Sequence, residues 1–215
     1  MSNYSTFKAL DNVCFSVKKG EVFGVMGSNG AGKSTLLRVL AGVLAPSEGG
    51  VEVNGSLDSF IKLGAGFDAD LNAIENIYLN GALHKKSRTE LREAVPRILE
   101  FAELTDVAHK PIKYYSSGMY ARLGFSTAIE RDPDILLVDE ILGVGDERFF
   151  RKCNQVFESF IARKKTVVIV SHGTSVFEKL AHRTCLLSQG SIVFIGDSKT
   201  AIEKYRDPSY QTAMR

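Results

Sequence analysis

The stretch from Gly27 to Thr35 has the residue types of a phosphate-binding loop and reads GSNGAGKST. It fits the pattern G-x-x-x-x-G-K-[ST], in which glycines let the backbone take positive φ and approach a phosphate chain closely. The N–H groups of such a loop converge on phosphate oxygens at the positive end of the following helix. We expect Lys33 to reach the β- and γ-phosphates of a nucleotide and Ser34 to hold Mg²⁺. The expected nucleotide-binding residues are Gly27, Ser28, Asn29, Gly30, Ala31, Gly32, Lys33, Ser34 and Thr35.

The sequence on either side of this loop favours phosphate binding over a glycine-rich turn that binds nothing. Residues 21–26 are apolar and β-prone, and residues 34–42 have helical spacing. A strand, a glycine loop and a helix, in that order, are the context that the motif needs.

A second apolar run, residues 135–138, ends in Asp139 and Glu140. Four apolar residues in a row are typical of a strand buried on both faces of a parallel sheet. Ligands of such sheets bind at the carboxyl ends of the strands. We therefore expect Asp139 to hold Mg²⁺ and Glu140 to accept a proton from an attacking water. The alternative is a charged strand end that faces solvent.

Two further polar positions lie where a phosphate would be recognised. His172 directly follows the apolar residues 166–170, where it would contact a γ-phosphate and orient water, although a lone histidine there often has a structural role. Ser116 and Gly118 lie in YSSGM, just before a helical pattern that starts at Met119. A helix N-terminus stabilises an anion, and the alternative is an ordinary serine cap.

Length and composition indicate an ordinary globular chain. The 215 residues are 44% hydrophobic, and a net charge of +2 gives no basic field that would argue for nucleic acid. No apolar run is as long as a membrane span, and the start of the chain has no signal-peptide pattern. The three cysteines are widely spaced, which predicts small buried thiols in a reducing compartment.

The order of elements indicates an α/β core that is interrupted by a helical stretch. Strand signals vanish between residues 72 and 128, where helical spacing takes over, and Pro96 predicts a kink or a break within it. The other expected elements are a hairpin at 8–25, strands at 51–55, 59–63, 134–140 and 166–170, a helix at 146–162, a hairpin at 184–195 and a helix at 198–205.

Together, GSNGAGKST, YSSGM, ILLVDE, GVGD and VSH resemble the motifs of an ATP-binding cassette (ABC) ATPase, in order and spacing, over nearly the whole chain. By position, residues 27–35 match the Walker A loop and residues 135–140 the Walker B strand. Residues 116–119 match the signature motif, residues 143–146 the D-loop and His172 the switch histidine.

The resemblance implies a fold class: an α/β P-loop NTPase cassette with a RecA-like core, an antiparallel β subdomain and an inserted α-helical subdomain. Residues 1–215 would form one cassette, with its core at 1–71 and 129–215 and the helical subdomain at 72–128.

The resemblance also implies the chemistry of the site, with ATP and Mg²⁺ as cofactors. Lys33, Glu140 and His172 would be catalytic, and Ser34 and Asp139 would hold the metal. Further nucleotide contacts would come from Ser116, Ser117, Gly118 and Met119, and from Tyr4 stacked on adenine, a role for which Phe7 competes.

A narrower resemblance is to the ATPase subunits of exporters for O-antigen, teichoic acid and capsule polysaccharides. It rests on LGAGF at 63–67, ENIYLNG at 75–81, the YSSGM form of the signature, and VGDE at 144–147 with Lys152-Cys153. The sequence departs from the general cassette pattern in Tyr115 and Ser117 of the signature and in the absence of a Q-loop glutamine between residues 54 and 77. We also expect no counterpart of the family's first strand.

This resemblance implies a homodimer with two ATP molecules at its interface and an integral-membrane permease as partner, at the cytoplasmic face of the cell membrane. The alternatives are an ABC ATPase for another substrate, one without a permease that acts on DNA or ribosomes, and a non-catalytic cassette.

Overall fold

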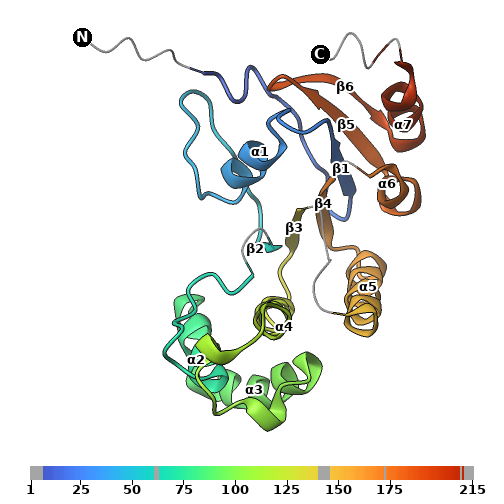
Figure 1. Cartoon of the computed structure of the whole chain (residues 1–215). Helices are drawn as coiled ribbons and strands as arrows, with labels where there is room; N and C mark the ends of the chain where they lie inside the picture. Colours follow the sequence, from blue (N-terminus) through green and yellow to red (C-terminus); the bar gives the residue numbers. More distant parts are fainter. Residues whose placement is uncertain (1–6, 61–62, 140–145, 172, 209, 211–215) are drawn as a thin grey trace. The chain divides into compact units, whose positions relative to one another are not determined.

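The computed structural model describes residues 7–60, 63–139, 146–171, 173–208 and 210. The chain forms two compact units (Figure 1). The sheet unit comprises Met1–Ile61, Asp134–Ile141 and Phe160–Arg215, and the helical unit comprises Lys62–Pro133 and Leu142–Ser159. The predicted phosphate loop and Asp139 therefore belong to the sheet unit, and the predicted signature motif belongs to the helical unit.

A six-stranded sheet organises the sheet unit, in the order β2-β3-β4-β1-β5-β6. The first five strands in this order are parallel, and β6 runs antiparallel to β5. The strands are β1 (Val22–Met26), β2 (Leu57–Ser59), β3 (Ile135–Asp139), β4 (Thr166–Ser171), β5 (Arg183–Ser188) and β6 (Ser191–Asp197).

The apolar runs that predicted parallel strands at 134–140 and 166–170 form β3 and β4, which confirms those predictions. A strand covered on both faces needs an almost unbroken apolar sequence, and every residue of β1 is buried. In the register of the sheet, Met26 pairs with Ser171 and Asp139 pairs with Val170. The carboxyl ends of β1, β3 and β4 thus lie at one edge of the sheet.

The helices of the sheet unit are α1 (Lys33–Leu40), α6 (Thr174–Leu180) and α7 (Ser198–Arg206). Gly24 in the middle of β1 is required by close packing, because a Cβ there would lie 2.6 Å from both Phe177 on α6 and Thr184 on β5. The core of the unit gathers Phe23, Val25, Leu36, Leu37, Leu137, Val168, Val170, Cys185 and Leu187.

The predicted hairpin at 184–195 and the final helix are also confirmed. β5 and β6 are joined at Gln189 and Gly190, whose φ values of 46° and 80° suit the tight hairpin turns that match the twist of a sheet.

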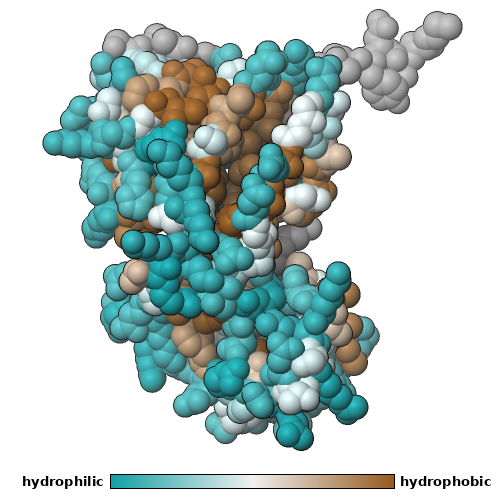
Figure 2. Space-filling model, turned by 180° about the vertical axis from the view of Figure 1, so that it is seen from behind, coloured by the Kyte–Doolittle hydropathy of each residue, from teal (hydrophilic) through white to brown (hydrophobic). Residues whose placement is uncertain are grey.

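Two predicted β segments do not form strands. Residues 8–21 of the predicted first hairpin and residues 51–55 contain no strand, although Val13, Phe15 and Val17 do pack against the core. An alternating sequence becomes a strand only where a neighbouring strand takes up its backbone hydrogen bonds. The described residues form isolated bonds in the first segment, such as the one from the Asp11 amide to the Gly190 carbonyl, but no strand ladder. Residues 42–56 are exposed as a result. Figure 2 shows that hydrophobic residues reach the surface of the sheet unit as well.

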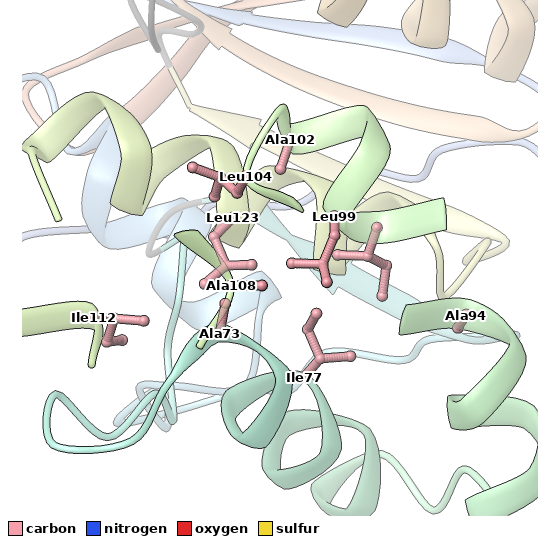
Figure 3. Close-up of a cluster of buried hydrophobic side chains, with 10 residues drawn as sticks. Ala73, Ile77, Ala94, Leu99, Ala102, Leu104, Ala108, Ile112 and Leu123 are labelled. Atoms are coloured by element: carbon pink, nitrogen blue, oxygen red, sulfur yellow. The ribbon is translucent and has the colours of Figure 1, made fainter. Parts of the chain in front are cut away.

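The helical unit contains α2 (Ala73–Leu83), α3 (Arg88–Ala102), α4 (Ser117–Ile129) and most of α5 (Glu147–Ala162), with 3₁₀ turns at Thr105–Val107 and Ile112–Tyr114. Its core gathers small and branched residues from α2, α3, α4 and the segment of 3₁₀ turns between α3 and α4 (Figure 3). The cluster consists of Ala73, Ile77, Ala94, Ile98, Leu99, Ala102, Leu104, Ala108, Ile112 and Leu123.

Helix α3 runs through Pro96, so the predicted break does not occur. Ala94, Ile98 and Leu99 are buried on either side of the proline, and their packing holds the helix together. Helix α5 buries Phe149, Cys153, Phe157 and Phe160. Among the described residues, no helix is long and apolar enough to cross a membrane.

The predicted burial of small thiols holds for two of the three cysteines. Cys153 and Cys185 are buried, whereas Cys14 is exposed. Burial raises the pKa of both buried thiols to about 12, and the thiolate is the reactive form. We expect a thiol reagent such as DTNB to titrate one cysteine in the native protein at pH 8 and all three after unfolding. Rapid reaction of a second thiol in the native protein would contradict this burial.

Candidate functional site

The phosphate loop follows β1 directly and ends at the first residue of α1, as the sequence predicts. Gly30 and Gly32 have φ of 83° and 103°, values that other residues rarely adopt. A Cβ on Gly27 would lie 2.3 Å from the carbonyl oxygen of Leu187. Both backbone strain and close packing therefore require glycine in this loop.

The back of the loop rests on the turn between β5 and β6. The Gly190 amide donates to the carbonyl of Ala31 over 3.0 Å, and the Gly190 carbonyl accepts from the Asp11 amide over 2.8 Å. A Cβ on Gly32 would come within 2.7 Å of the Ala9 carbonyl. The hairpin turn and residues 9–11 thus brace the loop from behind.

Helix α1 begins without a side-chain cap, so the N–H groups of its first turn have no side-chain acceptor. Four N–H groups at a helix start lack partners within the helix, and the helix dipole adds positive potential there. A phosphate group is the ligand that suits such an end. Ser34, in this first turn, exposes its side chain beside the same N–H groups.

Lys33 is folded over the loop that precedes it. Its side chain is 9% exposed, and its Nζ donates to the carbonyls of Gly27 and Ser28 at 2.8 Å each. Burial lowers the pKa of this amine, while the charge of Asp139 acts in the opposite direction. An ammonium with so little water around it interacts strongly with an approaching anion.

Asp139 at the end of β3 is the acidic counterpart of Lys33. Burial raises the pKa of Asp139, while the charges of Lys33 and Arg38 lower it. Its carboxyl forms no hydrogen bond to any residue that the structure describes. The Asp139 carboxylate and the Ser34 hydroxyl are hard oxygen donors, which Mg²⁺ prefers, so the residues present fit the predicted metal. In the described ranges, no cluster of three or more His, Cys, Asp or Glu side chains offers another metal site.

Three of the predicted site residues, Tyr4, Glu140 and His172, lie outside the described residues, as do residues 143–145 of the predicted D-loop. Their predicted roles stay predictions. Phe7, the alternative to Tyr4, is 87% exposed.

The predicted signature motif forms the start of α4. Ser116 is the N-cap, and its Oγ accepts a hydrogen bond from the Met119 amide over 3.2 Å. Among the described residues nothing requires glycine at position 118, because a Cβ there would meet only Ser116 Oγ, at 3.9 Å. Ser116 can cap the helix and also lie at an anion site, because Ser116 and Ser117 stand at an exposed helix N-terminus.

Tyr115, which departs from the usual leucine of the signature, has a local explanation. Its ring packs against the core of the helical unit, and its hydroxyl donates to the Val107 carbonyl over 2.9 Å. The tyrosine thereby ties the start of α4 to the turn at Thr105–Val107.

A group of residues that our sequence reasoning missed holds the glycine loop at 63–67 and the residues that follow it, up to Asn72. Tyr120 Oη donates to the Gly64 carbonyl over 3.1 Å, and Asn80 Nδ2 donates to the Ala65 carbonyl over 3.1 Å. Asn76 is fully buried, and its amide bonds the backbone at Asp68, Leu71 and Asn72. The sequence does contain an indication of these contacts, because two asparagines lie four residues apart on a mostly apolar helix.

Gly124 provides a direct test of this packing. A Cβ at Gly124 would lie 2.6 Å from the Gly64 nitrogen, and backbone cannot easily move away. We expect Gly124→Ala to lower the free energy of unfolding by about 1–3 kcal/mol, the range for overpacked sites. Urea unfolding measures this, with Gly118→Ala on the same helix as the control that loses no stability. Equal stability of both variants would contradict the packing.

The sheet unit thus has the strand, glycine loop, lysine and neighbouring acidic strand end that define a P-loop nucleotide-binding protein. Residues 10–143 match the sequence model of the ABC transporter family. The chain therefore belongs to the ABC transporter family, among its ATPases. This confirms the predicted fold class and enzyme class.

Several named proteins show which members of this family the chain is similar to. The chain is 42% identical to the O-antigen export system ATP-binding protein RfbB of Klebsiella pneumoniae, over 93% of this chain and 81% of that protein. It is 41% identical to the teichoic acids export ATP-binding protein TagH of Shouchella clausii, over 94% of this chain and 56% of that protein. Among solved structures, a dimeric MJ0796 cassette of a bacterial ABC transporter superposes with a TM-score of 0.75 at 25% identity, covering 92% of this chain and 94% of that one.

Proposed function

We propose that the chain is the ATP-hydrolysing subunit of an exporter that moves a cell-surface polysaccharide of the O-antigen, teichoic acid or capsule type. The similarity to RfbB and TagH over nearly the whole chain carries this proposal. The motif ENIYLNG supports it, because Asn80 within that motif bonds the loop at 63–67 and Asn76 bonds the adjoining residue Asp68. That loop stands where the usual Q-loop glutamine is missing from the sequence.

In this proposal each part of the phosphate site has a separate task. The loop N–H groups and Lys33 bind the phosphates, and the desolvated ammonium offsets charge that grows on them during hydrolysis. Ser34 and Asp139 would hold Mg²⁺, which would supply further charge neutralisation. Glu140 accepts a proton from the attacking water, and His172 orients that water at the γ-phosphate.

The signature turn acts in a second copy of the chain. Ser116, Ser117, Gly118 and Met119 of one copy would contact the nucleotide bound to the phosphate loop of the other. Gly118 supports this arrangement, because no described neighbour requires a glycine there, and the open space beside it leaves room for a ligand. Two ATP molecules then join the copies, and their hydrolysis lets the dimer open, a two-state change that a permease can use.

We place this dimer on an integral-membrane permease at the cytoplasmic face of the cell membrane. The substrate is tested by replacing the chromosomal gene with a Lys33→Ala form and extracting surface and internal polysaccharide separately. The proposal predicts that the glycan disappears from the surface and accumulates inside. Unchanged surface glycan, with ATP hydrolysis by the wild-type protein intact, would favour an ABC ATPase for another substrate.

A further inference from the structure

Glu103 has a backbone conformation that its residue type does not favour. It is the C-cap of α3 with φ of 58° and ψ of 44°, a left-handed position at which glycine is the usual residue. A side chain in this conformation carries a steric penalty of about 1–2 kcal/mol. The position of its carboxylate, rather than the backbone, therefore accounts for a glutamate here.

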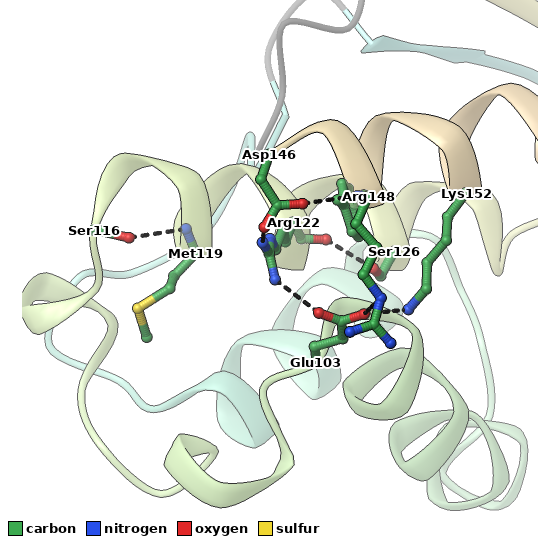
Figure 4. A network of polar contacts seen from close by, with 9 residues as sticks. Glu103, Ser116, Met119, Arg122, Ser126, Asp146, Arg148 and Lys152 are labelled. Carbon is green, nitrogen blue, oxygen red and sulfur yellow. Dashed lines mark hydrogen bonds and ion pairs between the residues drawn. The ribbon is translucent and has the colours of Figure 1, made fainter.

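The Glu103 carboxylate gathers three cations from two other helices (Figure 4). Oε2 accepts from Arg122 Nη1 over 3.1 Å, and Oε1 accepts from Lys152 Nζ over 2.5 Å. Arg148 Nε lies 3.7 Å from Oε1. The hydrogen bond from Lys152, with the charges of Lys152, Arg148 and Arg122, holds the pKa of Glu103 below its usual value. Lys152, which the narrower resemblance singled out, thus has a partner.

Arg122 connects this carboxylate to a second one. Its side chain is 17% exposed, and its Nη2 donates to Asp146 Oδ2 over 2.5 Å. The guanidinium carbon lies 5.2 Å from the centre of the Phe149 ring, so the planar group is stacked as well as paired. A lysine lacks the planar guanidinium, whose two terminal nitrogens donate to both carboxylates in this geometry.

Both ends of this connection belong to segments that the proposed function uses. Arg122 lies one turn beyond Met119 on α4, whose N-terminus carries the signature residues. Asp146 caps α5 through its Oδ1, which accepts from the Phe149 amide over 2.9 Å, and it is the last residue of the predicted D-loop. In the described part of the helical unit, Arg122 is thus the link between the signature helix and the residue that closes the D-loop.

We propose that Arg122, held in place by Glu103, is a positioning residue of the ATPase. It fixes the signature turn and Asp146 in one orientation, so that both meet the nucleotide on a second copy together. This inference rests on the proposed function. The charge network fixes the surface that α3, α4 and α5 present before a second copy binds. Such preorganisation lowers the cost of assembling the complete site.

The test compares Arg122→Lys and Glu103→Gln with a control pair in the same unit. Arg97 and Glu130 also form a charged pair, but they contact neither the signature turn nor Asp146. We expect Arg122→Lys to lower kcat about tenfold or more, because small misplacements in a preorganised site have large effects on rate. Glu103→Gln should have a smaller effect of the same kind, and Arg97→Lys none.

Three further readouts separate positioning from folding. Binding of a fluorescent ATP analogue to the monomer should change less than about twofold in Arg122→Lys, because the phosphate loop lies in the sheet unit. ATP-driven dimer formation in a Glu140→Gln background should weaken, while Tm stays near that of Arg97→Lys. The double variant Glu103→Gln with Arg122→Lys should lose little beyond Arg122→Lys alone, since the two residues act as one unit.

A normal kcat in Arg122→Lys would overturn this inference, and so would a loss of rate that only follows a fall in Tm. If Arg122→Lys does not fold, Glu103→Gln takes its place, and a normal kcat in that variant overturns the inference equally. Failure of the wild-type chain to hydrolyse ATP would instead overturn the proposed function.

Discussion

A Lys33→Met variant is expected to lose at least about a hundredfold in ATP hydrolysis, the scale seen when a donor that stabilises transition-state charge is removed. The physical reason lies in the pocket around Nζ, where the ammonium is buried and bonded only to two loop carbonyls at 2.8 Å. Because little water screens its charge, the electrostatic attraction between the ammonium and a bound phosphate is strong. Methionine keeps the length and packing of the side chain and removes the charge.

Steady-state release of phosphate measures this effect, and binding of a fluorescent ATP analogue shows whether affinity falls with the rate. Lys18→Met is the matched control, because Lys18 is an exposed lysine of the same unit. We expect Lys18→Met to hydrolyse ATP normally. Hydrolysis by Lys33→Met at the wild-type rate would show that the loop backbone alone provides the charge stabilisation.

Replacing Glu140 by glutamine is expected to lower turnover by about two to four orders of magnitude, the usual contribution of a general base. The amide has the shape of the carboxylate but cannot accept the proton of the attacking water. ATP and Mg²⁺ should then hold two copies together, because the step that separates them is blocked. Light scattering during size-exclusion chromatography, with and without ATP, measures the fraction of dimer.

Adding Ser116→Arg to Glu140→Gln should return the protein to monomers in the presence of ATP. The long side chain fills the turn at the start of α4 that would face the second copy's nucleotide. Ser116→Ala controls for the lost cap, which itself contributes about 1 kcal/mol to helix stability. Thr89→Arg, an exposed substitution elsewhere in the helical unit, controls for added charge. Dimers that survive Ser116→Arg would contradict the head-to-tail arrangement.

The phosphate site was predictable because its chemistry is encoded locally. Glycines at 27, 30 and 32, an adjacent lysine and an apolar strand on one side need no distant partner to be recognised. Asp139 was predictable for a similar reason, since an apolar run that ends in an acid is typical of a strand in the interior of a parallel sheet.

Elements that depend on a neighbour were predicted less well. The alternating residues around Val13 and Val51 have the pattern of strands, but a pattern does not provide a hydrogen-bonding partner. Pro96 reads as a helix breaker, yet burial on both sides of it keeps α3 continuous. Propensity is a weak prior, which tertiary packing overrides in both cases.

The polar contacts of the helical unit were the least predictable part. Asn76 and Asn80 donate hydrogen bonds to backbone carbonyls. Because every residue has a backbone carbonyl, the sequence does not indicate which residue accepts these bonds. Glu103, Arg122 and Asp146 are far apart along the chain and of ordinary residue types. Only the fold brings their charges together.

The turn at Gln189 and Gly190 has a practical consequence for labelling experiments. A two-residue hairpin turn is normally a convenient place for a fluorophore or an inserted peptide. Here the Gly190 amide holds the Ala31 carbonyl, so a probe at the turn would disturb nucleotide binding while leaving the fold intact. Residues 42–56, which are exposed throughout, are the better position for a reporter.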